Sequence, residues 1–268
     1  MSTQKARKKK AKPRKVRGKI KKRKRLTQEM GDILLFKYRP VNKYLLDSLV
    51  KSQLHFALPS NLNDPYDCQV DLKRALVRAA DLAKGAQKTK LRRLVSDLTM
   101  LRTIKDLLRK TAVCSFSDSL LNPVLWSHYA DEHRGVALLY RVPQSLILDT
   151  TTEIVGYSGV EYSEDSLTNW LVVNPVRFHV DYYVRIIKHA LTIKGPTWAY
   201  EGESRIMRAR AGHLEIDPLI LTQICFGLRT PKSDKDLIRK IVDSNYSKMD
   251  FCEIVVGDND FGLKAKDL

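Results

Sequence analysis

Residues 112–140 read AVCSFSDSLLNPVLWSHYADEHRGVALLY, and this stretch decides the class of fold. Its two short apolar runs, 112–116 and 136–140, contain Val, Phe and Tyr and are typical of buried strands. Similar patterns predict strands at 33–38, 54–57, 154–160, 205–209, 220–226 and 251–256, and helices at 41–52, 143–148, 182–191 and 233–244. Because strands outnumber helices and do not alternate strictly with them, the sequence predicts an α+β fold. We expect a mixed or antiparallel twisted sheet with flanking helices.

A helical insertion is predicted between the second and third of these strands. Residues 71–84 and 88–110 have the apolar spacing of two helices, which are separated around Gly85. The segment 71–110 holds 12 Lys and Arg residues against 4 acidic ones, so it would carry a basic surface, either a solvated face or a binding site. We therefore expect one α+β domain over residues 29–268, with the helical insertion at 71–110.

The N-terminal segment carries much of the net charge of +18, since residues 1–25 hold 15 of the 48 Lys and Arg residues and no acidic one. Its few apolar side chains cannot offset the entropy of ordering, so residues 1–28 are predicted to be a disordered tail. Basic side chains that neutralise phosphates release counterions, which predicts salt-sensitive binding to nucleic acid or another polyanion. Without aromatic side chains for stacking, sequence-specific recognition is not expected there. The candidate contacts are Lys8, Lys9, Lys10, Arg14, Lys15, Arg17, Lys21, Lys22, Arg23, Lys24 and Arg25.

The same basic residues would also suit a targeting signal or a contact with anionic lipid. No run of about twenty apolar residues occurs, so we expect no transmembrane segment. The N-terminus also lacks the apolar stretch of a secretory signal. Four widely spaced cysteines argue against a zinc ribbon or a disulfide framework. We expect an intracellular, cytoplasmic location, or a nuclear one if the source is eukaryotic.

Motifs for the common kinds of catalytic site are absent. The sequence has no Gly-x-Gly-x-x-Gly, no phosphate-binding Gly-Lys-Ser/Thr loop, no His-Glu-x-x-His and no Gly-x-Ser-x-Gly. His128 and His133 are five residues apart, which does not suit a metal pair on a helix, so no metal site is predicted. Polar and aromatic residues instead gather near the ends of predicted strands, where functional sites tend to be built.

These polar clusters are KYRP at 37–40, NLNDPYD at 61–67, SFS at 115–117, LWSHYA at 125–130 and WAYEGESR at 198–205. In this order they resemble a widespread, largely bacterial family, the domain of unknown function 2971. Its members share an Asn-Asp-Pro-Phe/Tyr-Asp loop, a Trp-Ser-His-Tyr-Ala motif and a late Trp-x-Tyr-Glu-x-Glu-x-Arg. The resemblance covers roughly residues 33–230. It implies little about function, because the family itself is poorly characterised.

A looser resemblance, to ADP-ribosyltransferases of the Arg–Ser–Glu type, implies an activity. In that family an arginine on the first strand holds an NAD phosphate, a Ser-x-Ser-like element supports the nicotinamide ribose, and a Glu-x-Glu carries the chemistry. The residues that stand in this order here are Arg39, then Ser115 and Ser117, then Glu201 and Glu203.

The second resemblance also implies roles for these residues. The guanidinium of Arg39 would bind phosphate. Glu203 would bond the ribose 2′-hydroxyl and stabilise the transition state, and Glu201 would position or deprotonate the acceptor. Further cofactor contacts would come from Tyr38, Ser115, Ser117, Trp126 and Tyr129. Tyr38, Phe116 or Trp126 could stack on nicotinamide.

The sequence therefore favours an NAD-dependent ADP-ribosyltransferase-like domain acting on nucleic acid or a nucleic-acid-associated target, which could serve as a defence or toxin effector. Two alternatives stay open. One is a non-enzymatic nucleic-acid-binding protein, in which the tail and the basic helices wrap a polyanion and the polar clusters only stabilise the domain. The two glutamates would then form a solvated strand face, and Arg39 would pair with Asp64 or Asp67. The other is a metal-dependent nuclease in which Asp64, Asp67 and either glutamate hold magnesium.

Overall fold

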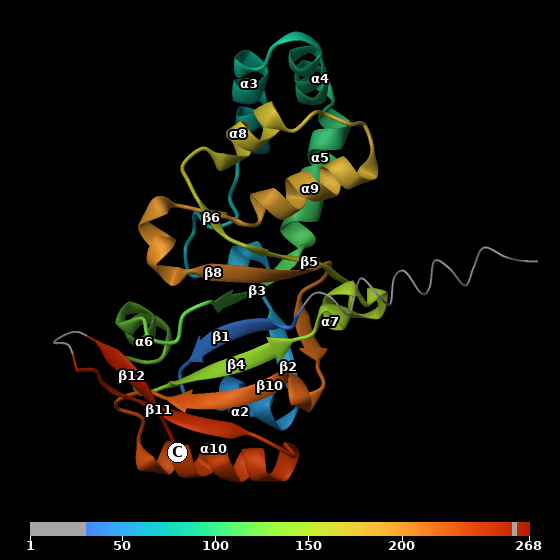
Figure 1. The fold of residues 1–268 in the computed structure, drawn as a ribbon. Helices are drawn as coiled ribbons and strands as arrows, with labels where there is room; N and C mark the ends of the chain where they lie inside the picture. The colour runs from blue at the N-terminus through green and yellow to red at the C-terminus, as the bar shows by residue number, and fades with distance from the viewer. Residues whose placement is uncertain (1–30, 259–261) are drawn as a thin grey trace, which may run out of the picture.

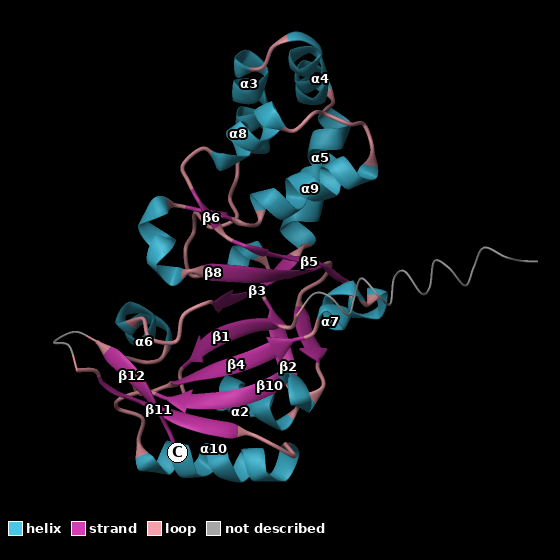
Figure 2. Cartoon of the chain, in the orientation of Figure 1, coloured by secondary structure: helices cyan, strands magenta, loops and turns pink. Residues whose placement is uncertain are grey.

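The computed structural model describes residues 31–258 and 262–268 (Figure 1). The predicted tail, residues 1–28, and its candidate polyanion contacts lie outside the described residues. The predicted α+β class is confirmed, because a large mixed sheet is flanked by helices (Figure 2). None of the helices within the described ranges is long and apolar enough to cross a membrane.

The main sheet has eight strands in the order β12-β11-β10-β4-β1-β3-β8-β5. All neighbouring strands are antiparallel except β10 and β11, which run parallel. The strands are β1 (Ile33–Arg39), β3 (Ala112–Ser117), β4 (Val136–Val142), β5 (Ile154–Gly159), β8 (Glu203–Arg208), β10 (Leu221–Phe226), β11 (Asp250–Val256) and β12 (Leu263–Asp267). Seven of them overlap strands that the sequence predicts, and β12 was not predicted.

The sheet is split between its two central strands, β1 and β3. β1 pairs with β4 along seven residues and β3 pairs with β8 along six, but β1 and β3 share only the pair Phe36 and Ser117. Beyond this pair the Lys37 ammonium crosses to β3 and donates a hydrogen bond to the Ser115 carbonyl, at 2.8 Å. A side chain thus satisfies a carbonyl that a continuous ladder would have paired with a backbone N–H.

A first hydrophobic core packs against the sheet and includes buried residues of β1, β3, β4, β8 and β10. Two helices, α2 (Lys43–Val50) and α10 (Lys232–Asn245), pack together and contribute buried residues to it. A small sheet of β2 (Gln53–Phe56) and β9 (Gly212–Glu215) adds Phe56 to the same core. On a separate cluster of apolar residues, α6 (Pro123–Tyr129) packs its buried Leu125 and Trp126 against Tyr38 of β1.

The insertion forms a second core with two later helices. The helices that lie together beyond β5 in Figure 1 are α3 (Leu72–Leu82), α4 (Gly85–Ser96), α5 (Leu98–Lys110), α8 (Ser166–Val173) and α9 (Val180–Ala190). Their inward faces bury one contiguous apolar cluster. The other elements are η1 (Pro59–Asn61), α7 (Gln144–Leu148), η2 (Thr150–Thr152), β6 (Glu161–Tyr162), β7 (Ile193–Lys194), η3 (Pro196–Glu201) and η4 (Pro218–Ile220).

The predicted pair of helices over 71–110 is wrong in number, because the chain forms three. Asp97 interrupts the second predicted helix and begins α5 as its N-cap, where its carboxylate accepts a hydrogen bond from the Met100 amide at 2.9 Å. Such a cap satisfies an amide that has no partner inside the helix. The apolar periodicity runs through Asp97 almost unbroken, so spacing alone did not reveal the break.

Replacing Asp97 by Ala should destabilise the chain by about 1 kcal/mol, the usual effect of losing an N-cap. Urea unfolding followed by circular dichroism measures this change. Asp106→Ala, an exposed position within the same helix, is the matched control and should change stability little. Equal effects of the two substitutions would contradict the capping role.

Candidate functional site

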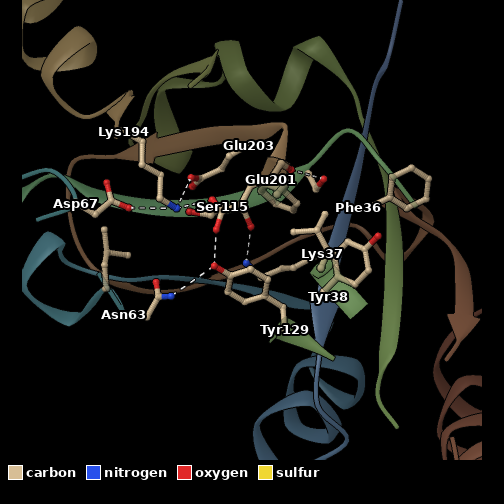
Figure 3. A pocket seen from close by; sticks show the side chains of 14 residues that line it. Phe36, Lys37, Tyr38, Asn63, Asp67, Ser115, Tyr129, Lys194, Glu201 and Glu203 are labelled. Atoms are coloured by element: carbon tan, nitrogen blue, oxygen red, sulfur yellow. Dashed lines mark hydrogen bonds and ion pairs between the residues drawn. The ribbon is translucent and has the colours of Figure 1, made fainter. Parts of the chain in front are cut away.

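A cavity opens at the split in the sheet, with a volume of about 590 Å³ counted to its open mouth. About 150 Å³ of this volume is open to a water-sized sphere, which is less than the roughly 300–1,000 Å³ of typical small-molecule sites. Segments far apart in the sequence converge on it, as Figure 3 shows. They are β1 with Phe36, Lys37 and Tyr38, the loop before α3 with Leu62, Asn63 and Asp67, β3 with Ser115 to Ser117, α6 with Leu125 and Tyr129, β7 with Lys194, and the η3–β8 junction with Glu201 and Glu203.

Arg205 anchors the inner wall of this cavity and is completely buried. Its guanidinium donates to both oxygens of Asp67, at 2.9 and 2.6 Å, and to both oxygens of Glu203, at 2.7 and 2.9 Å. It also donates to the Leu191 carbonyl at 2.8 Å. A planar guanidinium suits such paired contacts, and a charge buried this deeply requires them. The arginine therefore fixes Glu203 and the Asp67 loop to each other.

Lys194 is the second buried cation. Its ammonium bonds to Glu201, lies 3.2 Å from Glu203 and 3.8 Å from Asp67, and rests over the Trp198 ring. Burial lowers the pKa of Lys194, but the three carboxylates outweigh it and raise the pKa above its ordinary value. The lysine thus stays charged among the three carboxylates. No metal-binding cluster of three or more His, Cys, Asp or Glu residues occurs in the part of the chain that the structure describes.

Glu201 is the carboxylate best suited to exchange a proton. The Tyr129 hydroxyl donates to one of its oxygens at 2.5 Å, and Lys194 bonds to the other. Burial raises the pKa of Glu201, and these two hydrogen bonds offset the rise only in part. Burial and the bond to Glu201 also raise the pKa of Tyr129, so its phenol keeps the proton. A carboxyl with a raised pKa beside a cavity is a candidate general acid or base.

Glu203 has the opposite environment. Burial alone would raise its pKa, but the hydrogen bonds and charge of Arg205, together with the charge of Lys194, lower the pKa to about 2. Both of its oxygens already accept from Arg205. Glu203 is therefore ionised at neutral pH, and its hydrogen-bonding capacity is largely used within the protein.

The two glutamates do not occupy one solvated strand face, as one interpretation of the sequence had it. Glu201 ends η3, and Gly202 follows it with a φ of 50°, a left-handed conformation that glycine adopts without strain. A Cβ at this position would lie 2.2 Å from an oxygen of Asp118. The turn at Gly202 brings both carboxylates to the cavity, where each is almost fully buried.

Six of the eight residues that the sequence assigned to an NAD site line the cavity, and two do not. The six are Tyr38, Ser115, Ser117, Tyr129, Glu201 and Glu203. Trp126 is completely buried in the core beneath α6 and donates its indole N–H to the Leu120 carbonyl, so it offers no ring face to a ligand. Arg39 is also not among the lining residues. Within the described ranges it makes no ion pair, and Asp67, one of its predicted partners, pairs with Arg205 instead.

Sequence reasoning missed two cations of the site, Lys37 and Lys194. Lys37 lies next to Tyr38 in the KYRP cluster at 37–40, but the resemblance assigned the phosphate contact to Arg39. Lys194 follows Ile193 in a two-residue strand that pairs parallel to β6, and only that pairing carries it to the carboxylates. A single lysine in an apolar stretch gives no sequence signal of such a position.

The fold and the site define a mixed α+β domain with a buried ionic cavity. Residues 125–206, 82 of the 268, match the model of a family described as "Protein of unknown function (DUF2971)". The predicted resemblance is thereby confirmed over the stretch from α6 to β8, which supplies Tyr129, Lys194, Glu201 and Glu203 to the cavity. Searches of curated proteins and of solved structures found no match to the chain.

Replacing Glu203 by Gln should lower the free energy of unfolding at pH 7 by on the order of 3 kcal/mol, as expected for a pKa held at about 2 instead of 4.5. Because the folded-state pKa is depressed, this stability is present above the unfolded-state pKa and is lost as the pH falls toward 2. The difference in free energy of unfolding between wild type and variant should therefore become smaller between pH 5 and pH 3, as measured by urea unfolding. Glu215→Gln, at an exposed position on β9, is the control. A difference in free energy of unfolding that does not change with pH would contradict the depressed pKa of Glu203.

Proposed function

We propose that the cavity binds NAD and that the chain is an ADP-ribosyltransferase-like enzyme, whose target is nucleic acid or a protein associated with it. The observation that carries the proposal is the convergence of the cavity. Tyr38, Ser115, Ser117, Tyr129 and Glu201 come from four separate segments, were assigned to one site from the sequence, and line one hollow. Chance agreement of short motifs would not be expected to bring them together.

The residues of the cavity fit the two ends of such a ligand. Phe36, Tyr38 and Tyr129 give aromatic surface beside the hydroxyls of Ser115 and Ser117, which suits a nicotinamide riboside. Lys37 would hold the diphosphate. Its ammonium makes one hydrogen bond, to the Ser115 carbonyl, and no carboxylate of the described residues lies within 4.0 Å of it. Lys37 therefore takes the role that the resemblance gave to Arg39.

Glu201 would be the catalytic residue, and Glu203 a positioning one. Bound NAD would supply an ADP-ribosyl group by cleavage of its bond to nicotinamide. The ionised Glu201 carboxylate would take the proton of the acceptor, and Lys194 and Tyr129 would hold the side chain toward the cavity. Glu203 would keep Lys194 and Arg205 in place, since its own oxygens are bonded to these cations.

Lys37→Ala should abolish saturable NAD binding to the chain, because it removes a lining cation that no carboxylate of the described residues neutralises. Isothermal calorimetry with NAD measures this, and Arg39→Ala is the matched control, two residues along the same strand and outside the cavity. The proposal expects Arg39→Ala to bind as wild type does. Binding lost only in Arg39→Ala would restore the original assignment, and absence of binding to wild type at millimolar NAD would refute the NAD site.

Glu201→Gln should slow nicotinamide release from NAD by about 100-fold or more, the usual contribution of a general base. In the wild type the rate should rise with pH through the raised pKa of Glu201, because only the ionised carboxylate can accept a proton. Release of nicotinamide is followed by chromatography over a pH series, with Glu215→Gln as a surface control. A Glu201→Gln variant of full activity, folded by circular dichroism, would sink this role.

A further inference from the structure

A second hollow lies on the helical part of the molecule, between α5 and the segment that leads into α3. It encloses about 1230 Å³ counted to its open mouth. Four basic side chains line it: Lys73 at the start of α3, and Arg102, Lys105 and Arg109 along α5. We call this hollow the basic groove.

The cations of the basic groove are exposed, and the protein does not neutralise them. Within residues 31–258 and 262–268, none of the four forms an ion pair or donates a side-chain hydrogen bond. Other basic residues of these helices are engaged, since Arg78 pairs with Asp165 at 2.6 Å and Arg93 lies over the Phe178 ring. The acidic residue that lines the groove, Asp71, already caps α3 through the Arg74 amide. The groove is therefore a site of uncompensated positive charge.

The cations follow a line. Arg102, Lys105 and Arg109 are spaced by three and four residues, so they share one face of α5 and extend over about 10 Å of its axis. Between them and α3 the groove has an aliphatic surface that includes Leu98 and Leu101, and no aromatic residue lines it. A row of charges beside aliphatic surface suits a chain of regularly spaced anions with apolar groups between them.

We propose that the basic groove binds a single strand of nucleic acid through its sugar–phosphate backbone. The phosphates would meet the four cations and the sugars would pack on the leucines, while the absence of aromatic platforms makes binding independent of base sequence. Four of the lining residues are cations and three of them lie along one helix, so one phosphate backbone laid along α5 could reach them. This site is distinct from the N-terminal tail and does not depend on what the cavity binds.

The test compares two double variants of the full chain that lose the same charge. Lys105→Gln with Arg109→Gln removes two of the four cations that line the basic groove. Lys84→Gln with Arg92→Gln removes two exposed cations of the insertion that do not line it. Fluorescence anisotropy with a labelled oligothymidine strand gives the affinity over a series of salt concentrations. Each lost phosphate contact should reduce the slope of log K against log salt by about 0.7, so the groove variant should lose about 1.4. The control variant should keep the wild-type slope.

Two results would overturn the proposal. Equal loss of slope in both variants, with folding confirmed by circular dichroism, would mean that the groove adds nothing beyond general charge. Stronger competition by a polyglutamate peptide than by an unlabelled oligothymidine strand would assign the groove to an acidic protein partner instead. Neither result depends on NAD binding, so the groove and the cavity can fail separately.

Discussion

The structure depends on a buried group of five charged side chains, in which Lys194 and Arg205 face the carboxylates of Asp67, Glu201 and Glu203. Moving such charges out of water is expensive, and each is tolerated only while its partners remain in place. The group therefore joins the loop before α3, strands β7 and β8, and the end of η3 into one unit. With three carboxylates against two cations, one negative charge is in excess. The excess falls on Glu201, whose pKa is raised while that of Glu203 is lowered. The same electrostatics that fix the fold thus leave one carboxyl ready to exchange a proton.

The position of this group follows from the split in the sheet. On one side of the split β1 continues into β4, β10, β11 and β12, and on the other side β3, β8 and β5 lead toward the helical core. Strands β3 and β8 contribute residues to both cores. β1 and β3 share a single residue pair. Polar side chains can therefore lie between these two strands without interrupting a longer ladder of backbone hydrogen bonds. Functional sites are common where two packed units meet, and this cavity is at such a junction.

Local patterns predicted much of the fold but only part of the site. Short apolar runs identified seven of the eight strands of the main sheet, because burial on a sheet requires such residues at those positions. Polar clusters at strand ends identified Ser115, Ser117, Tyr129 and both glutamates, since these flank predicted strands. Lys194 could not be found this way, because its role comes from a two-residue strand paired with a distant one. The prediction for Trp126 was wrong, because an indole among polar residues suggests a stacking surface for a ligand. In the structure α6 directs this side chain into a buried apolar cluster. Burial of this kind is a property of tertiary packing and not of the residue type.

One loop connects the two sites that carry our proposals. Asn63 and Asp67 line the cavity, and the chain from Cys68 onward lines the basic groove. At the junction Cys68 has a φ of 58°, an uncommon conformation for a residue with a side chain, and its sulfur accepts a hydrogen bond from Arg205 at 3.0 Å. A displacement of the loop at the groove would thus pull on Asp67 and on the guanidinium that holds Glu203. Since Glu203 in turn positions Lys194 beside Glu201, a strand in the groove has a direct physical route to the carboxyl of the cavity. Contacts between buried side chains, and not a flexible linker, therefore connect the lining of the groove to the lining of the cavity.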